Sequence, residues 1–89
     1  MPAYSIKVIG KVQGVFFRAS TQEKAQSLKI KGWVRNEPDG SVRIQAEGNV
    51  EALRELTTWC NNGSNRAQVQ QVVVDEIEEE GFSEFQIRR

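Results

Sequence analysis

The stretch YSIKVIGKVQGVFFRASTQEKAQSLKI, residues 4–30, contains the change of periodicity that decides the fold. Apolar and polar residues alternate over 4–8, which predicts a strand with one buried face that ends near Gly10. From about residue 19 to residue 30 the apolar residues follow a helical spacing, and Gly32 is expected to end that helix. A strand, a glycine-containing loop and a helix in this order begin a βα unit.

The rest of the chain continues with two strands, a helix and a further strand. The expected elements are strands at 33–36 and 42–47, a helix from the N-cap Asn49 to Asn62-Gly63, a strand at 69–77 with a bulge at Gln70-Gln71, and an edge strand at Phe85 and Ile87. This βαββαβ order predicts an α+β fold, the ferredoxin-like split βαβ sandwich. We expect an antiparallel sheet with two helices on one face and a short extra carboxyl-terminal edge strand, in a single domain over residues 1–89.

The predicted topology brings two distant segments together. A right-handed crossover through the first helix makes the first two strands parallel, with the third strand between them. Their carboxyl ends then share one edge of the sheet. The loop after the first strand and Asn36, at the end of the second, should face each other across about 10 Å, or two strand spacings. A small anion fits between them.

Composition excludes several functional classes. The chain has no histidine and one cysteine, which excludes a Ser-His-Asp triad, a phosphohistidine intermediate and a His-ligated metal site, so no metal or cofactor is expected. Twelve basic residues balance twelve acidic ones, so the broad positive field typical of nucleic-acid binding is missing. No run approaches the roughly 18 apolar residues of a membrane span, and no signal peptide is visible. We expect a cytoplasmic protein that binds neither nucleic acid nor membrane.

The loop at residues 13–18 has the properties of a phosphate-binding site. Consecutive backbone N–H groups in such a turn form a concave nest, and the following helix adds a partial positive charge. Arg18 ends the loop with a guanidinium group that matches phosphate oxygens. Composition alone leaves open a second interpretation, a tight turn allowed by Gly14 with an exposed arginine.

Two longer motifs make the assignment more specific. The segment Gly10-x-Val12-Gln13-Gly14-Val15-x-Phe17-Arg18 resembles the first signature of the acylphosphatase family, and Gly32-Trp33-Val34-Arg35-Asn36-x-x-Asp39-Gly40-x-Val42 resembles the second. Ala46-Glu47-Gly48 looks like a further family segment, so the resemblance covers nearly the whole chain. One departure is the segment 62–69, which lacks the proline often found there and leaves the rigidity of that loop open.

The resemblance implies hydrolysis of acyl phosphates to a carboxylate and inorganic phosphate, without a metal ion. It implies that Arg18 and Asn36 are catalytic, and that the substrate phosphate binds to the backbone amides of Gln13, Gly14, Val15, Phe16, Phe17 and Arg18. The residue inventory agrees, because a carboxylate leaving group with a conjugate-acid pKa near 4 needs no general acid. Asn36 is neutral, so it suits the orientation of an attacking water. The expected partners are a small acyl phosphate and inorganic phosphate, as product or inhibitor, and a monomer is expected.

Side chains near these motifs have ordinary structural interpretations. Phe17, Trp33 and Trp59 are expected to pack in the interior. Arg35 alternates with Asn36 along the second strand, so it is expected to point to the opposite face. Lys11 is expected to be a solvated loop lysine.

Three alternatives remain at this stage. Cys60 and Arg66 have the C-x5-R spacing of cysteine-dependent phosphatases, but Cys60 is expected at the end of a helix rather than of a strand. A non-catalytic ferredoxin-like binding module, such as an RNA-recognition domain, would show more aromatic residues on its strands. The third is an acylphosphatase-like domain of a larger protein, such as a hydrogenase-maturation carbamoyltransferase. We expect a complete domain instead, since the sequence shows none of the cysteine-rich zinc motifs of such a protein.

Overall fold

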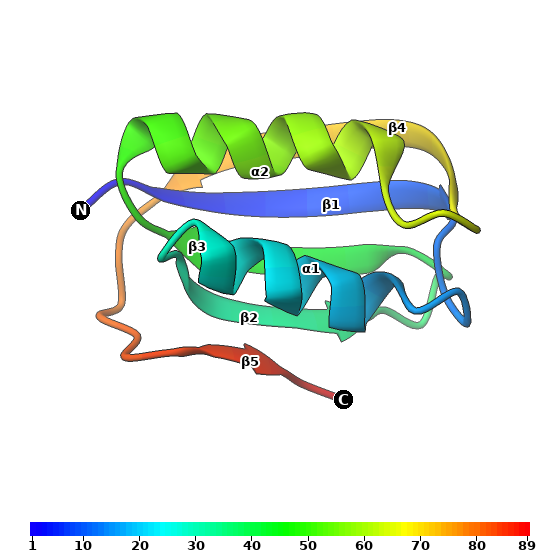
Figure 1. Cartoon of the computed structure of the whole chain (residues 1–89), viewed down its shortest axis with the longest axis horizontal. Helices are drawn as coiled ribbons and strands as arrows, with labels where there is room; N and C mark the ends of the chain where they lie inside the picture. Colours follow the sequence, from blue (N-terminus) through cyan, green and yellow to red (C-terminus); the bar gives the residue numbers. More distant parts are fainter.

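Two helices cover one face of a five-stranded sheet in the computed structural model, which describes residues 1–89 (Figure 1). The elements in chain order are β1 (Ala3–Lys11), α1 (Phe17–Ser27), β2 (Lys31–Asn36), β3 (Val42–Glu47), α2 (Val50–Asn62), β4 (Gln68–Ile77) and β5 (Phe85–Ile87). The predicted ferredoxin-like arrangement with an extra carboxyl-terminal edge strand is therefore confirmed. Neither helix has the length and apolar character needed to cross a bilayer.

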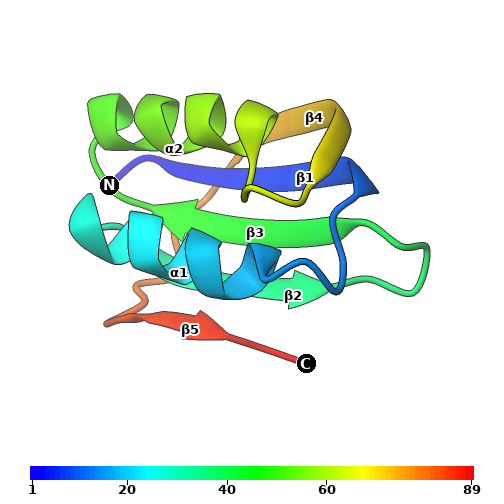
Figure 2. The same ribbon diagram turned by 45° about the vertical axis from the view of Figure 1, so that its right-hand side comes forward.

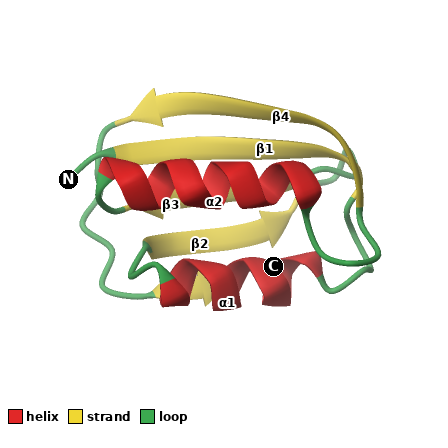
Figure 3. Ribbon diagram, turned by 45° about the horizontal axis from the view of Figure 1, so that its top comes forward, coloured by secondary structure: helices red, strands yellow, loops and turns green.

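The strand order β4-β1-β3-β2-β5 determines where the loops lie. β3 is antiparallel to both β1 and β2, so β1 and β2 are parallel to each other, as predicted. The loops that follow these two strands consequently lie at the same end of the sheet, the right-hand end of Figure 1, and Figure 3 shows the same relation after rotation.

The direction of β5 was predicted wrongly, because every pair of neighbouring strands was expected to be antiparallel. β5 pairs with β2 in parallel, through Gly32–Phe85 and Val34–Ile87. The reason is geometric: β4 ends at the end of the sheet where β1 and β2 begin, and the chain then passes behind the sheet near that end to the opposite edge (Figure 2). A strand that starts there runs in the same direction as β2.

A buried carboxylate fixes the connection between β4 and β5. Glu47 is 2% exposed and accepts hydrogen bonds from the backbone N–H groups of Gly81 and Phe82 at 3.2 and 3.0 Å, and from that of Glu80. These charge-assisted bonds satisfy a carboxylate that would be costly to bury alone. They hold the carboxyl-terminal segment against the sheet and so set the position of β5.

The core lies between the sheet and the two helices. Alternate residues of the central strands point toward the helices and are completely buried, and residues of α2 with helical spacing meet them. The fully buried members include Ile6, Val8, Val34, Ile44, Leu53, Leu56 and Cys60. Each such side chain contributes about 1.5–3 kcal/mol when it is removed from water, so this layer supplies the main stabilisation of the scaffold.

The end of α1 was predicted wrongly. The helix ends at Ser27, before the expected Gly32, because Lys29 adopts a left-handed conformation with φ 60°. The N–H of Lys29 donates to Gln26 O at 3.1 Å and that of Ile30 to Ala25 O at 2.9 Å, which is the Schellman pattern. A lysine gives no signal for this role, since glycine usually occupies it.

Gly32 has a different function in the fold. It lies inside β2 with φ 141°, and a Cβ at this position would come within 1.8 Å of Gln45 O. Glycine is therefore needed for the close approach of β2 to β3 rather than for ending a helix.

The bulge predicted in the fourth strand is confirmed. It lies in β4, opposite the end of β1. The register passes from Ile9–Gln71 to Gly10–Val69, which leaves Gln70 as the extra residue. A bulge bends the strand and increases its local twist. Here that strand is β4.

Candidate active site

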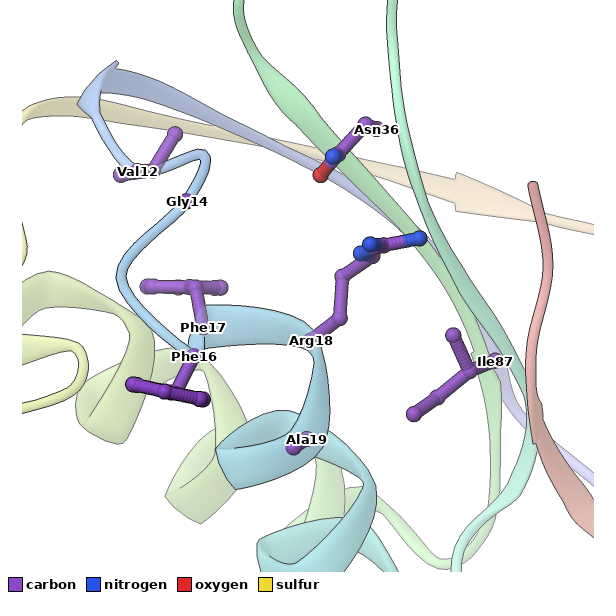
Figure 4. A pocket seen from close by; sticks show the side chains of 8 residues that line it. All are labelled: Val12, Gly14, Phe16, Phe17, Arg18, Ala19, Asn36 and Ile87. Carbon is purple, nitrogen blue, oxygen red and sulfur yellow. The ribbon is translucent and has the colours of Figure 1, made fainter.

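A pocket of about 300 Å³ lies at the sheet edge where β1 and β2 end. Its lining residues are Val12, Gly14, Phe16, Phe17, Arg18, Ala19, Asn36 and Ile87 (Figure 4). The structure thus brings Arg18 of α1 and Asn36 of β2, which are 18 residues apart in the chain, to the same pocket. In Figure 4 the guanidinium group of Arg18 points toward Asn36, and the turn with Gly14 faces both side chains.

The 13–18 loop presents unpaired backbone donors. Gly14 has φ 71° and Phe16 has φ 60°, so left-handed residues alternate with their neighbours, as in an anion-binding nest. None of the N–H groups of residues 13–18 donates a hydrogen bond to another protein atom. A set of unpaired N–H groups is costly unless water or a ligand accepts from them. This loop is therefore suited to an anion with several acceptor oxygens.

The amino terminus of α1 adds to this positive potential. The helix begins at Phe17, its N-cap residue Phe16 makes no side-chain capping bond, and its first turn contains no acidic residue. No capping side chain or first-turn carboxylate of this helix offsets the partial positive charge at this end, which is equivalent to roughly half a unit charge. A phosphate group would cap the helix in place of a side chain.

Arg18 is half-buried and its charge is not compensated. Its only hydrogen bond runs from Nη1 to the carbonyl oxygen of Arg88 at 3.4 Å, and it takes part in none of the ion pairs of the structure. Arg88 follows β5, so the carboxyl-terminal segment helps to orient the guanidinium. The remaining donors are available to an anion in the pocket.

Asn36 carries an unsatisfied acceptor. Its Oδ1 atom is the one buried side-chain polar atom without a hydrogen-bond partner. Leaving such an atom unpaired costs about 1–3 kcal/mol, so this acceptor contributes no hydrogen bond to the fold. Asn36 lines the pocket, so this unpaired acceptor lies next to the space that a ligand would occupy.

Two side-chain contacts connect the 13–18 loop to other segments, and neither was predicted. Ser64 Oγ donates to Val15 O at 2.9 Å, which ties the turn after α2 to the loop in the segment that lacks the family proline. Gln13 Nε2 donates to the carbonyl oxygens of Glu37 and Ser41. Only the backbone amide of Gln13 was expected to matter, and no local pattern identifies side-chain contacts over such separations.

The neighbouring aromatic residues are placed as expected. Phe17 is 1% exposed, and its ring centroid lies 5.4 Å from that of Trp59. Trp33 is 5% exposed beneath the guanidinium of Arg35, which lies 4.6 Å from its ring centroid. Arg35 therefore does not line the pocket, in agreement with its predicted direction. Ile87 and Ala19 do line it but were not predicted, because aliphatic side chains carry no chemical signal.

Comparison with known proteins identifies the family. The acylphosphatase family model matches residues 4–87. The chain belongs to the acylphosphatase family. It is 50% identical over 74 residues to the acylphosphatase of Marinobacter nauticus, covering 83% of this chain and 80% of that one. The crystal structure of acylphosphatase from Bacillus subtilis superimposes with a TM-score of 0.97 at 41% identity and covers both chains completely.

Acylphosphatases are enzymes, so the activity of this chain is hydrolysis of acyl phosphates rather than non-catalytic binding. The sequence alternative of a ferredoxin-like binding module was therefore wrong. The same fold occurs within a larger protein, since the chain is 31% identical to HypF from T. kodakarensis with a TM-score of 0.84. It covers 12% of that protein.

A cysteine phosphatase mechanism is incompatible with the environment of Cys60. The thiol lies in the core on α2 and is 0% exposed, and burial raises its pKa to about 12. A nucleophilic cysteine needs the thiolate, which positive surroundings stabilise and apolar surroundings oppose. The C-x5-R spacing in this acylphosphatase is thus a coincidence of sequence.

We expect Cys60→Ala to retain kcat within about twofold, because the residue does not line the pocket, and to lose about 1 kcal/mol of stability from the smaller core side chain. Steady-state kinetics and urea unfolding of the same preparation measure both quantities. Loss of turnover with an intact fold would contradict this account and revive the thiolate mechanism.

Proposed function

We propose that this acylphosphatase hydrolyses its substrate by direct attack of a water molecule on phosphorus. In this proposal Arg18 and the backbone amides of residues 13–18 hold the phosphate, and Asn36 orients the water. The observation that supports it best is the combination of unpaired groups in one pocket. The N–H groups of residues 13–18 donate to no other protein atom. Gly14, Phe16, Phe17 and Arg18 of this loop line the pocket, and so does Asn36, whose Oδ1 atom is unpaired.

The donors are suited to the charge of the transition state. Phosphoryl transfer passes through a loose transition state whose negative charge is spread over three equatorial oxygens. Fixed N–H dipoles and a guanidinium group stabilise that charge without reorganising during the reaction. Helix α1 adds its partial charge on the same side.

Asn36 handles the nucleophile in this scheme. Its Oδ1 accepts a hydrogen bond from the water and directs a lone pair toward phosphorus, in line with the bond that breaks. The new bond joins the water oxygen to phosphorus, the bond from phosphorus to the acyl oxygen breaks, and the carboxylate leaves with that electron pair. The proton of the water passes to the phosphate product or to solvent.

No general acid or metal ion is needed in this proposal, since a carboxylate is a good leaving group. Residues 1–89 are proposed to act as a single domain and a cytoplasmic monomer without a cofactor. Its partners are then a small acyl phosphate and inorganic phosphate, with neither nucleic acid nor membrane involved.

Benzoyl phosphate hydrolysis in the presence of a chelator tests this function. We expect full activity with excess chelator and competitive inhibition by inorganic phosphate, because the product presents the same oxygens to the 13–18 loop. Activity that disappears with chelator and returns with added magnesium would contradict the metal-free mechanism. Turnover unaffected by phosphate would contradict the proposed phosphate site.

A further inference from the structure

The side chain of Gln13 joins the two halves of the candidate active site. Its Nε2 atom donates to Glu37 O and to Ser41 O, both at 2.8 Å. The acceptors are 24 and 28 residues away and belong to the hairpin that follows β2. One end of this bridge thus lies in the 13–18 loop. The other end lies in the hairpin, where Glu37 directly follows Asn36.

The hairpin does not need this bridge for its own closure. Ser41 O already accepts from the N–H of Glu37 at 2.9 Å, and Glu37 O accepts from the N–H of Gly40 at 3.1 Å. Each carbonyl is therefore satisfied once without Gln13. The second bond at each carbonyl adds little to the hairpin itself but fixes the hairpin relative to the loop.

The primary amide is the chemical group that this position requires. Both hydrogens of one NH₂ group are used on two carbonyl oxygens, which no other uncharged side chain of similar length provides. The contact is half-buried, so its geometry is less exposed to competition from water than a surface contact.

We infer that Gln13 is a positioning residue, which sets the separation between the 13–18 loop and Asn36 and so aligns the attacking water with phosphorus. This inference rests on the proposed function. It predicts a specific division of effects: turnover depends on the separation, whereas phosphate binding depends on the loop amides and Arg18. The loop retains its other support, the hydrogen bond from Ser64 to Val15 O.

The test compares Gln13→Leu and Gln13→Glu with the matched control Gln22→Leu. Gln22 Nε2 also donates from a half-buried position to a distant backbone carbonyl, that of Phe85 at 3.1 Å, but it does not join the loop to the hairpin. Leucine removes the donor at nearly constant size, and a glutamate carboxylate faces two carbonyl oxygens and repels them. Glutamate is therefore expected to have the larger effect.

We expect Gln13→Leu to lower kcat for benzoyl phosphate about tenfold or more, while the inhibition constant of inorganic phosphate stays within about threefold, because misplacement by an ångström is sufficient to slow the chemical step. Gln22→Leu should leave kcat nearly unchanged. Unchanged kcat in both Gln13 variants would overturn the inference. A rise in the phosphate inhibition constant parallel to the loss of kcat would also overturn it, since it would indicate general collapse of the loop.

The side-chain NH₂ resonances of Asn36 provide a second readout that is independent of turnover. They should shift in Gln13→Leu but not in Gln22→Leu, and equal spectra would contradict the positioning role. If the wild-type chain showed no hydrolysis, the proposed function would fail, and these spectra would still decide the structural claim.

Discussion

Replacement of Arg18 by alanine is expected to lower kcat/KM for benzoyl phosphate by about 10² or more, because it removes a preorganised charge from the transition state. The guanidinium is half-buried, makes no ion pair and lines the pocket, so no other cation replaces it. The same change should weaken inhibition by inorganic phosphate, since the product uses the same donors. Initial rates and phosphate inhibition constants measure the two effects.

Two further variants make the Arg18 result specific. Arg18→Lys keeps the charge but loses the planar fork, so it should recover only part of the lost activity. Arg54→Ala removes an exposed arginine from α2, far in the chain from the loop, and should leave turnover unchanged. If Arg18→Ala and Arg54→Ala gave the same near-normal rates, phosphate binding by Arg18 would be wrong.

Replacement of Asn36 by alanine is expected to lower kcat about 10²-fold with little change in the phosphate inhibition constant, because Asn36 acts on the water rather than on the phosphate. Its Oδ1 atom has no partner in the fold. Alanine should therefore leave the free energy of unfolding unchanged or raise it by about 1 kcal/mol. Rate measurements test the expected fall in kcat, and urea unfolding tests whether the free energy of unfolding is unchanged or higher.

Asn36→Asp is the matched variant, since it retains the size and the acceptor atoms. Its carboxylate brings a negative charge next to a bound phosphate, so we expect phosphate inhibition to weaken as well as turnover to fall. A decrease in stability on Asn36→Ala with normal turnover would indicate a structural amide and would contradict the proposed role.

The parts of the fold set by local periodicity could be predicted from sequence. Alternation in β1, helical spacing in α1 and the handedness of the crossover were sufficient to bring the 13–18 loop and Asn36 to one sheet edge. The extra residue at Gln70 was also visible, because it interrupts the apolar alternation of β4. These features depend on neighbours in the chain or on a general topological rule.

The remaining features depend on contacts between distant segments. Lys29 ends α1 in a conformation that glycine usually takes, and the two residues that bond across this end, Ile30 and Ala25, are buried in the core. The parallel direction of β5 follows from the path of the chain after β4. The bridge from Gln13 to the hairpin spans 24 and 28 residues, and the isolation of Asn36 Oδ1 is visible only when all its neighbours are in place.

Attack of water on phosphorus is the central claim, and isotope labelling tests it most directly. The chain would hydrolyse benzoyl phosphate in water enriched in the heavy oxygen isotope, with the spontaneous reaction subtracted. Our account predicts that the label enters inorganic phosphate, because the pocket holds the phosphate group between Arg18 and the water at Asn36. Label in the benzoate product would mean attack at the carbonyl carbon and would contradict the account.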